Sequence, residues 1–110
     1  MNESDFDALA ERALTAIEHA LEQTGVDADV ERKEGGVLEI EFGDGSKMIV
    51  NRHGAAREVW VAAREGGFHF RWDGSAWRDT RSSTELFACL SRLVSSQSGQ
   101  AVLLRPQDGG

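Results

Sequence analysis

The chain has 110 residues, of which 40% are hydrophobic, and a formal net charge of −7. This length suits a single domain with a modest core, and no apolar run approaches the roughly 20 residues that a membrane span needs. The acidic start of the chain predicts no signal peptide, and a lone cysteine, Cys89, excludes an internal disulfide and a multi-cysteine metal site.

The acidic residues are concentrated in the first part of the chain. Residues 1–44 hold thirteen acidic and three basic residues, whereas residues 45–110 hold six acidic and nine basic residues. For the acidic first part of the chain, this distribution argues against nucleic acid as a partner and favours cations or a basic protein surface. With one cysteine and no membrane segment, we expect a cytoplasmic protein.

The first element that the pattern predicts is a helix over residues 4–23. Ser4 and Asp7 have the spacing of a capping box, and apolar residues then recur at intervals of three and four. Gly25 follows and is expected to end the helix.

Alternating apolar and polar residues predict a series of short strands after this helix. Asp44-Gly45 indicates a tight hairpin, and other Gly-containing turns separate the remaining segments. Such short connections predict antiparallel neighbours. The expected strands are residues 29–33, 37–42, 47–52, 57–63, 67–73 and 76–80.

A second helix is expected over residues 83–97, where Ser82 and Glu85 form another capping box. Two helices and one antiparallel sheet of five to six strands predict an α+β fold, a two-layer α-β sandwich. We expect one domain over residues 1–110, with a tail at 100–110 that is partly flexible. Cys89 lies on the apolar side of this second helix, which predicts a buried, inert thiol.

The alternation also sorts the strand residues into two faces. One face is apolar and is expected to pack against the helices. The other is polar but carries Trp60, a candidate for partner contact whose alternative role is to stiffen the sheet. The apolar set is Leu38, Ile40, Phe42, Met48, Val50, Val59, Val61, Phe68, Phe70 and Trp72. The opposite set is Val37, Glu39, Glu41, Ile49, Asn51, Trp60, Ala62, His69 and Arg71.

Carboxylates form a stripe on the first helix. At 100° per residue, five of them fall within about 100° of one another, on the side away from the apolar face. No Lys or Arg occurs between Arg12 and Arg32, so these acids have no neighbouring cation in the sequence. The helix members are Glu3, Asp7, Glu11, Glu18 and Glu22, and Asp27, Asp29 and Glu31 extend the charge.

Two interpretations of this stripe stay open from the residues alone. It is either a solvated face that keeps the protein soluble or a surface for hard cations or a basic partner. Glu18 and Glu22 are four residues apart and could share one ion, with His19 adjacent. No calcium loop, zinc motif, nucleophile elbow or phosphate loop is present, so we expect no enzyme.

The order of the motifs resembles the frataxin family, specifically its bacterial type. The matching stretches are "GGVLEIEF", "DGSKMIVNR", "EVWVAA", "GGFHF" and "WRDTRSSTELFACL", and the similarity runs over about residues 1–99. This resemblance implies an α-β sandwich that binds Fe²⁺ or Fe³⁺ weakly through an acidic ridge on the first helix and the edge of the first strand.

The resemblance also implies partners. Members of the family bind a cysteine desulfurase and its iron–sulfur scaffold protein, with the ridge residues Glu18 and Glu22 meeting a basic surface. Asn51, Trp60 and His69 on the polar sheet face would form a second contact surface. The implied protein is a monomer with possible iron-dependent oligomers, and it acts on neither nucleic acid nor a membrane.

This chain departs from the family pattern at the ridge. His19 stands where an acid is usual, and Arg32 and Lys33 close the acidic stretch. The leading hypothesis is an iron-binding regulator or iron donor in iron–sulfur cluster assembly. The alternative is a purely protein-binding acidic module with incidental metal binding, and a ferroxidase would need a redox centre that the residues do not indicate.

Overall fold

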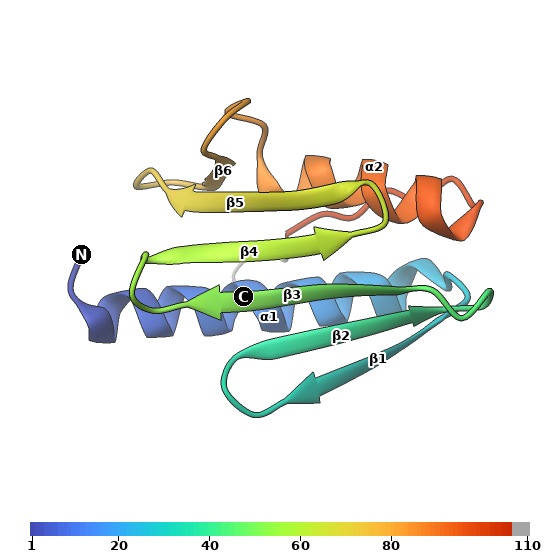
Figure 1. The fold of residues 1–110 in the computed structure, drawn as a ribbon, viewed down its shortest axis with the longest axis horizontal. Helices are drawn as coiled ribbons and strands as arrows, with labels where there is room; N and C mark the ends of the chain where they lie inside the picture. Colours follow the sequence, from blue (N-terminus) through green and yellow to red (C-terminus); the bar gives the residue numbers. More distant parts are fainter. Residues whose placement is uncertain (107–110) are drawn as a thin grey trace.

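The computed structural model describes residues 1–106 and shows a six-stranded antiparallel sheet covered on one face by two helices (Figure 1). The strands lie in the sheet in chain order, so β1 and β6 are its edges. This arrangement confirms the predicted two-layer α+β sandwich. The elements are α1 (Glu3–Thr24), β1 (Ala28–Lys33), β2 (Val37–Phe42), β3 (Lys47–His53), β4 (Glu58–Ala63), β5 (Gly66–Trp72), β6 (Trp77–Asp79) and α2 (Leu86–Ser98).

The first helix begins earlier than expected. Asn2, rather than Ser4, is its N-cap, because the Asn2 side chain accepts a hydrogen bond from the Asp5 backbone N–H at 2.8 Å. At the other end, Gly25 adopts a left-handed φ of 70° and ends the helix as predicted.

The second helix begins three residues later than expected, and the predicted Ser82–Glu85 capping box is wrong. Glu85 is itself the N-cap, and its carboxylate accepts from the backbone N–H groups of Phe87 and Ala88. The residues before it are held out of the helix, since Glu85 pairs with Arg78 in an isolated β-bridge and Ser83 has a φ of 65°. Residues 83–85, which the sequence pattern placed in the helix, therefore lie before it.

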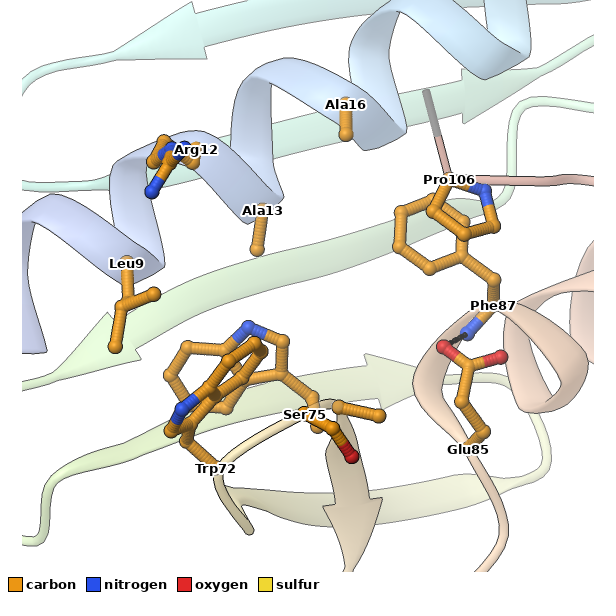
Figure 2. Close-up of a pocket in the computed structure, with 11 residues that line it drawn as sticks. Leu9, Arg12, Ala13, Ala16, Trp72, Ser75, Glu85, Phe87 and Pro106 are labelled. Atoms are coloured by element: carbon orange, nitrogen blue, oxygen red, sulfur yellow. Dashed lines mark hydrogen bonds between the residues drawn. The ribbon is translucent and has the colours of Figure 1, made fainter. Parts of the chain in front are cut away.

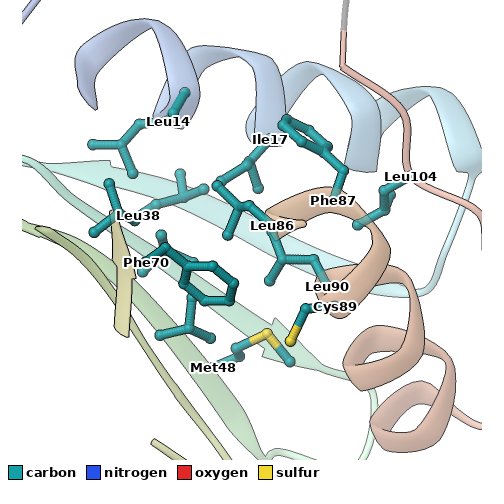
Figure 3. Close-up of a cluster of buried hydrophobic side chains, with 14 of the residues drawn as sticks. Leu14, Ile17, Leu38, Met48, Phe70, Leu86, Phe87, Cys89, Leu90 and Leu104 are labelled. Atoms are coloured by element: carbon teal, nitrogen blue, oxygen red, sulfur yellow. The ribbon is translucent and has the colours of Figure 1, made fainter. Parts of the chain in front are cut away.

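The core lies between the sheet and the two helices (Figure 3). Most of the predicted apolar set is buried there, but Phe68 and Trp72 on β5 are only half-buried. The ring of Phe68 is covered by the Arg92 guanidinium, and Trp72 lies edge-on to Trp77 across the β5–β6 pair. Cys89 is buried as predicted, and burial raises the pKa of its thiol.

The segment after α2 returns along that helix. Val102 packs against the core and Leu104 is buried, whereas Leu103 is exposed. Ser91 and Ser95, one turn apart on α2, accept hydrogen bonds from the backbone N–H groups of Leu104 and Val102. The part of the predicted flexible tail at 107–110 lies outside the described residues. Within residues 1–106, no helix is both long and apolar enough to span a membrane.

Candidate functional site

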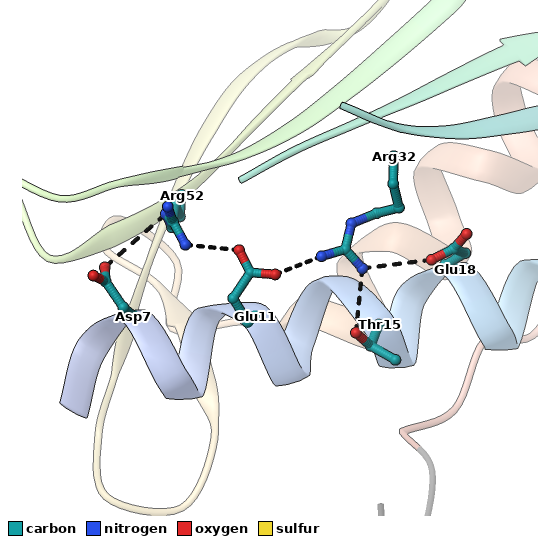
Figure 4. A network of polar contacts seen from close by, with 6 residues as sticks. All are labelled: Asp7, Glu11, Thr15, Glu18, Arg32 and Arg52. Carbon is teal, nitrogen blue, oxygen red and sulfur yellow. Dashed lines mark hydrogen bonds and ion pairs between the residues drawn. The ribbon is translucent and has the colours of Figure 1, made fainter. Parts of the chain in front are cut away.

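Several carboxylates of α1 form ion pairs. The sequence suggested otherwise, because no Lys or Arg lies near them along the chain. Arg32 on β1 contacts Glu11 at 2.5 Å and Glu18 at 3.5 Å. Arg52 on β3 contacts Glu11 at 2.7 Å and Asp7 at 4.0 Å. Figure 4 shows the two arginines reaching from the sheet to one row of helix side chains. Asp7, Glu11 and Glu18 are therefore a paired group.

Strand alternation explains how the arginines reach the helix. Arg32 follows Ala28 and Val30 on the same face of β1, and Arg52 follows Met48 and Val50 on β3. Both arginines therefore occupy the ends of helix-facing rows. Sequence reasoning missed this ion-pair network. The alternation of each strand already places both arginines on the face that packs against the helices, and this could have indicated the contacts.

The acids of β1 lie on the other face of the sheet. Asp29 and Glu31 are exposed and stand opposite Glu41 and Glu39, respectively, in the antiparallel register. Like charges directly opposite one another are destabilising unless a cation intervenes. Glu39 has such cations, because Lys33 lies at 2.9 Å and Lys47 at 3.3 Å. The hydrogen bond from Lys33 is the main cause that holds the pKa of Glu39 below its ordinary value.

The acidic surface is thus divided, whereas the sequence suggested one continuous ridge. Among residues 1–106, several of the predicted ligands have no Lys or Arg within ion-pair distance, and we call these acids the unpaired group. Asp27 lies in the connection between α1 and β1, with its carboxylate over Gly43. His19 is exposed on α1. The unpaired group consists of Glu3, Glu22, Asp27, Asp29 and Glu31.

The donor chemistry of the unpaired group fits a hard cation, since carboxylate oxygens are the ligands that such ions prefer. The geometry limits how tightly an ion could be held. In the described part of the chain, no three His, Cys, Asp or Glu side chains are grouped to surround one metal. Open carboxylates of this kind are suited to weak and exchangeable binding rather than to a closed metal centre.

The outer sheet face carries a stack of three aromatic rings. The Trp60 ring lies between the rings of His53 and His69, at centroid distances of 3.8 and 4.4 Å. In each pair the two ring planes are nearly parallel, with an interplanar angle of 10°. Both faces of the indole are therefore covered by imidazoles. A partner would meet the edge of Trp60 and the outer faces of the two histidines. Sequence reasoning named Trp60 and His69 but missed His53.

Glu58 anchors this stack from β4. It is only 6% exposed, and its carboxylate accepts hydrogen bonds from the Trp60 indole N–H and the Arg71 guanidinium, both at 2.8 Å. His69 lies 3.5 Å away from the same carboxylate. Burial by itself would raise the pKa of Glu58, but these hydrogen bonds and the Arg71 charge outweigh it and lower the pKa. The rotamer of Trp60 is thereby held in place.

The structure brings together only part of the predicted partner-binding set. Asn51, Trp60 and His69 form one row across β3, β4 and β5, because Asn51 pairs with Trp60 and Trp60 pairs with His69. Glu18 and Glu22 lie on α1, which covers the opposite face of the sheet (Figure 1). The two predicted contact surfaces are therefore separate, and one partner would have to reach around the β1 edge to touch both.

An apolar cleft of about 520 Å³ lies between α1, the β5–β6 turn and the start of α2 (Figure 2). Its walls include Leu9, Trp72, Phe87 and Pro106, with Arg12 among the polar residues that line it. None of the predicted metal or partner residues lines this cleft. This apolar cleft is therefore separate from both predicted surfaces; of the predicted ligands, Asp27 lines a different hollow, beside Gly43 and Gln100.

Comparison with known proteins identifies similar chains over almost the whole length. A model of the frataxin-like domain matches residues 1–100. The iron–sulfur cluster assembly protein CyaY of Dechloromonas aromatica is 61% identical over 105 residues, which cover 96% of this chain and all of that protein. The protein of the same name from Cupriavidus metallidurans is 51% identical and covers 96% of this chain and 97% of its own.

Solved structures agree with the fold. The frataxin of Psychromonas ingrahamii superposes with a TM-score of 0.88 at 33% identity, covering 96% of this chain and 99% of that chain. A trimeric frataxin of Saccharomyces cerevisiae, in its ferrous complex, has a TM-score of 0.66 at 22% identity and covers 91% and 88% of the two chains. This second likeness is one of fold alone.

Proposed function

Because this chain belongs to the frataxin family and is of the bacterial CyaY type, we propose that it is a non-catalytic regulator or iron donor in iron–sulfur cluster assembly. It would bind iron weakly and act on a cysteine desulfurase and its scaffold protein in the cytoplasm. The observation that carries this proposal is the unpaired group of carboxylates, whose oxygen atoms are free to contact a cation. The family membership gives this observation its functional meaning.

The iron part of the proposal depends on the unpaired group. Glu22 on α1 and Asp29 and Glu31 on β1 are exposed, so an ion reaches them without any rearrangement. Their oxygen chemistry suits Fe²⁺ and Fe³⁺ as cargo that is held briefly and released. The paired group, by contrast, already satisfies Arg32 and Arg52 and would have to lose those contacts before it could ligate iron.

Titration of Fe²⁺ under anaerobic conditions, followed through amide NMR signals, tests this assignment. We expect the signals of residues 17–31 to change at metal concentrations on the order of micromolar to millimolar, because isolated carboxylates bind weakly. The variant Glu22→Gln should weaken the response, and Glu34→Gln, an exposed acid in the β1–β2 turn, serves as the control. A response confined to residues far from the unpaired group would reject the site.

A second candidate function is a protein-binding module for which metal is incidental. The contact that favours it is the guanidinium of Arg32 on Glu11 and Glu18, because this helix face already holds an organic cation of the kind that a basic partner presents. Desulfurase binding would then be independent of iron and would weaken steeply as salt rises.

A pull-down with cysteine desulfurase, with and without iron and over a salt series, separates the two candidates. Glu22→Lys should lower the affinity by about threefold to tenfold at low salt, since an attractive contact becomes repulsive. Glu34→Lys makes the same charge change outside the predicted set and should have the smaller effect. Equal binding by the wild type and Glu22→Lys would remove the acidic surface from the mechanism.

A further inference from the structure

The apolar cleft between α1, the β5–β6 turn and the start of α2 has walls that suit an organic ring (Figure 2). Its volume of about 520 Å³ lies within the range of small-molecule sites in proteins, roughly 300–1,000 Å³. Trp72, Trp77 and Phe87 line it with aromatic side chains, and Leu9 and Ala16 line it from α1. The cleft is therefore an apolar space that the core of the protein does not fill.

Two indole N–H groups at this cleft have no acceptor within residues 1–106. Trp60, by contrast, donates to Glu58 at 2.8 Å. Trp72 and Trp77 donate to no described residue, yet no side-chain nitrogen in this part of the chain is both fully covered and without a hydrogen-bond partner. Trp77 is only 5% exposed and lines the cleft, so its N–H is open on the cleft side. Since a buried indole N–H usually has an acceptor, these groups are donors available to a ligand.

Arg12 supplies a positive charge at the same cleft. It is exposed on α1 and contacts no carboxylate among residues 1–106, unlike the arginines of the ion-pair network. The carboxylate that lines the cleft, that of Glu85, is already satisfied. Its two oxygens accept from the backbone N–H groups of Phe87 and Ala88 at 2.8 and 3.1 Å. The cleft thus combines apolar walls with a cation and N–H donors, which is the complement of an apolar anion.

We propose that this cleft binds a small aromatic carboxylate. The ring of the ligand lies against Trp72 and Phe87, and its carboxylate accepts hydrogen bonds from the Arg12 guanidinium and the indole N–H groups. The site uses neither the acidic residues of α1 and β1 nor the stack around Trp60. It therefore goes beyond the proposed function and stands or falls independently of it.

The charge of the whole molecule limits the affinity. A net charge of −7 opposes the approach of an anion, and Arg12 offsets this only locally. For a two-ring carboxylate of about 13 non-hydrogen atoms, the usual binding energy per atom gives a dissociation constant on the order of a millimolar. A neutral or cationic ring of the same size should bind more weakly, because it leaves the guanidinium without an acceptor.

Titration of 2-naphthoate onto the full chain, followed by the ¹⁵N–¹H NMR signals of the three indoles, tests the site. We expect the signals of Trp72 and Trp77 to move to higher proton chemical shift, because their N–H groups gain a carboxylate acceptor. The Trp60 signal is the internal reference, since Glu58 already holds that N–H. Trp72→Phe assigns the signals through the loss of its own. Movement of the Trp60 signal alone would place the ligand on the outer sheet face and overturn the proposal.

The role of the cation is tested by Arg12→Gln, which should lower the affinity for 2-naphthoate about threefold to tenfold. Arg64→Gln makes the same charge change in the β4–β5 turn, away from the cleft, and should bind like the wild type. Both arginines are exposed, so both variants should fold. The neutral 2-naphthamide should not distinguish the two variants. Equal affinities of Arg12→Gln and Arg64→Gln for 2-naphthoate would reject the carboxylate site.

The shape of the cleft is tested by filling it. Ala16→Leu places a larger side chain in the cleft wall and should weaken 2-naphthoate binding at least about threefold. Ala8→Leu is the matched control, because Ala8 is exposed on α1 outside the cleft and leucine is also a good helix former. Equal weakening by the two variants, or unmoved Trp72 and Trp77 signals in the wild type at about ten times the expected dissociation constant, would overturn the proposal.

Discussion

Glu58 shows how one buried carboxylate organises an exposed surface. Its two oxygens hold the indole of Trp60 and the guanidinium of Arg71, and the indole in turn orders His53 and His69 on its two sides. The position of these partly exposed rings is therefore decided by Glu58, which is itself buried. A substitution of Glu58 should therefore disturb the outer face of the sheet even though Glu58 is itself buried.

The first prediction concerns Glu58. Glu58→Ala should lower the free energy of unfolding by about 1–3 kcal/mol, because it leaves the buried end of the Trp60 and Arg71 contacts without an acceptor. Glu58→Gln retains an acceptor and should cost less. Denaturant unfolding measures both changes, and Trp fluorescence reports the loosened ring. An unchanged midpoint for Glu58→Ala would contradict this role.

The second prediction concerns how the stability of the protein depends on pH through Glu58. Its pKa in the folded protein lies below the ordinary value, so Glu58 stabilises the fold above the ordinary glutamate pKa of about 4.3 and loses this contribution as pH falls through the folded pKa. The free energy of unfolding should therefore decline below about pH 4. Glu58→Gln should decline less steeply over that range, and identical slopes for the two proteins would contradict the assignment.

At the level of the elements, α2 is stabilised by the segment that follows it. Ser91 and Ser95 present their hydroxyls to the backbone of residues 102–104, and Leu104 fills a buried position against the helix (Figure 3). The two serine hydroxyls thus accept the backbone N–H hydrogen bonds of Val102 and Leu104, which have no neighbouring strand among residues 1–106 to accept them. Leu104, beyond the last helix, therefore belongs to the structural core, and Val102 packs against it.

Substitution of Leu104 tests this dependence. Leu104→Ala should destabilise the fold by about 2–5 kcal/mol, since it removes a buried side chain and leaves a cavity. Leu103→Ala is the matched control, because Leu103 is 61% exposed and should change stability by less than about 0.5 kcal/mol. Thermal unfolding of the two variants measures the difference. Similar midpoints would show that the segment contributes no packing.

In the molecule as a whole, the charged groups and the aromatic stack occupy different elements around one hydrophobic core. The paired group joins α1 to β1 and β3. The unpaired group is spread over the exposed side of α1, the α1–β1 connection and the outer face of β1, and the aromatic stack lies on the outer face of β3 to β5. A single core lies between the sheet and the helices and contains residues from both helices and five strands. We propose that the chain is one cooperative domain and, without iron, a monomer.

Cooperative unfolding is the expected result of this arrangement. Far-UV circular dichroism, which follows the helices, and Trp fluorescence, which follows β4 to β6, should give one midpoint in denaturant. Light scattering should give the mass of a monomer in the absence of iron. Separate midpoints for the two probes would show that the helices and the sheet edge unfold independently.

Periodicity and turn chemistry in the sequence alone determined the element types, their order and the inward face of the strands, because these depend on neighbouring residues. Leu38, Ile40 and Val50 are buried where alternation predicts, and stretches such as "DGSKMIVNR" by themselves indicate the frataxin family. The start of α2 was misplaced because the bridge between Arg78 and Glu85 competes with a local helix signal.

Only the tertiary structure decided which charges meet. Arg32 is separated from Glu11 by 21 residues and Arg52 by 41, and no local pattern brings such distant side chains together. The same applies to the His53–Trp60–His69 stack, which depends on the register of three strands. Side chains on different elements meet only when the backbone packs those elements together. The division of the acidic surface into paired and unpaired groups is therefore a property of the folded chain.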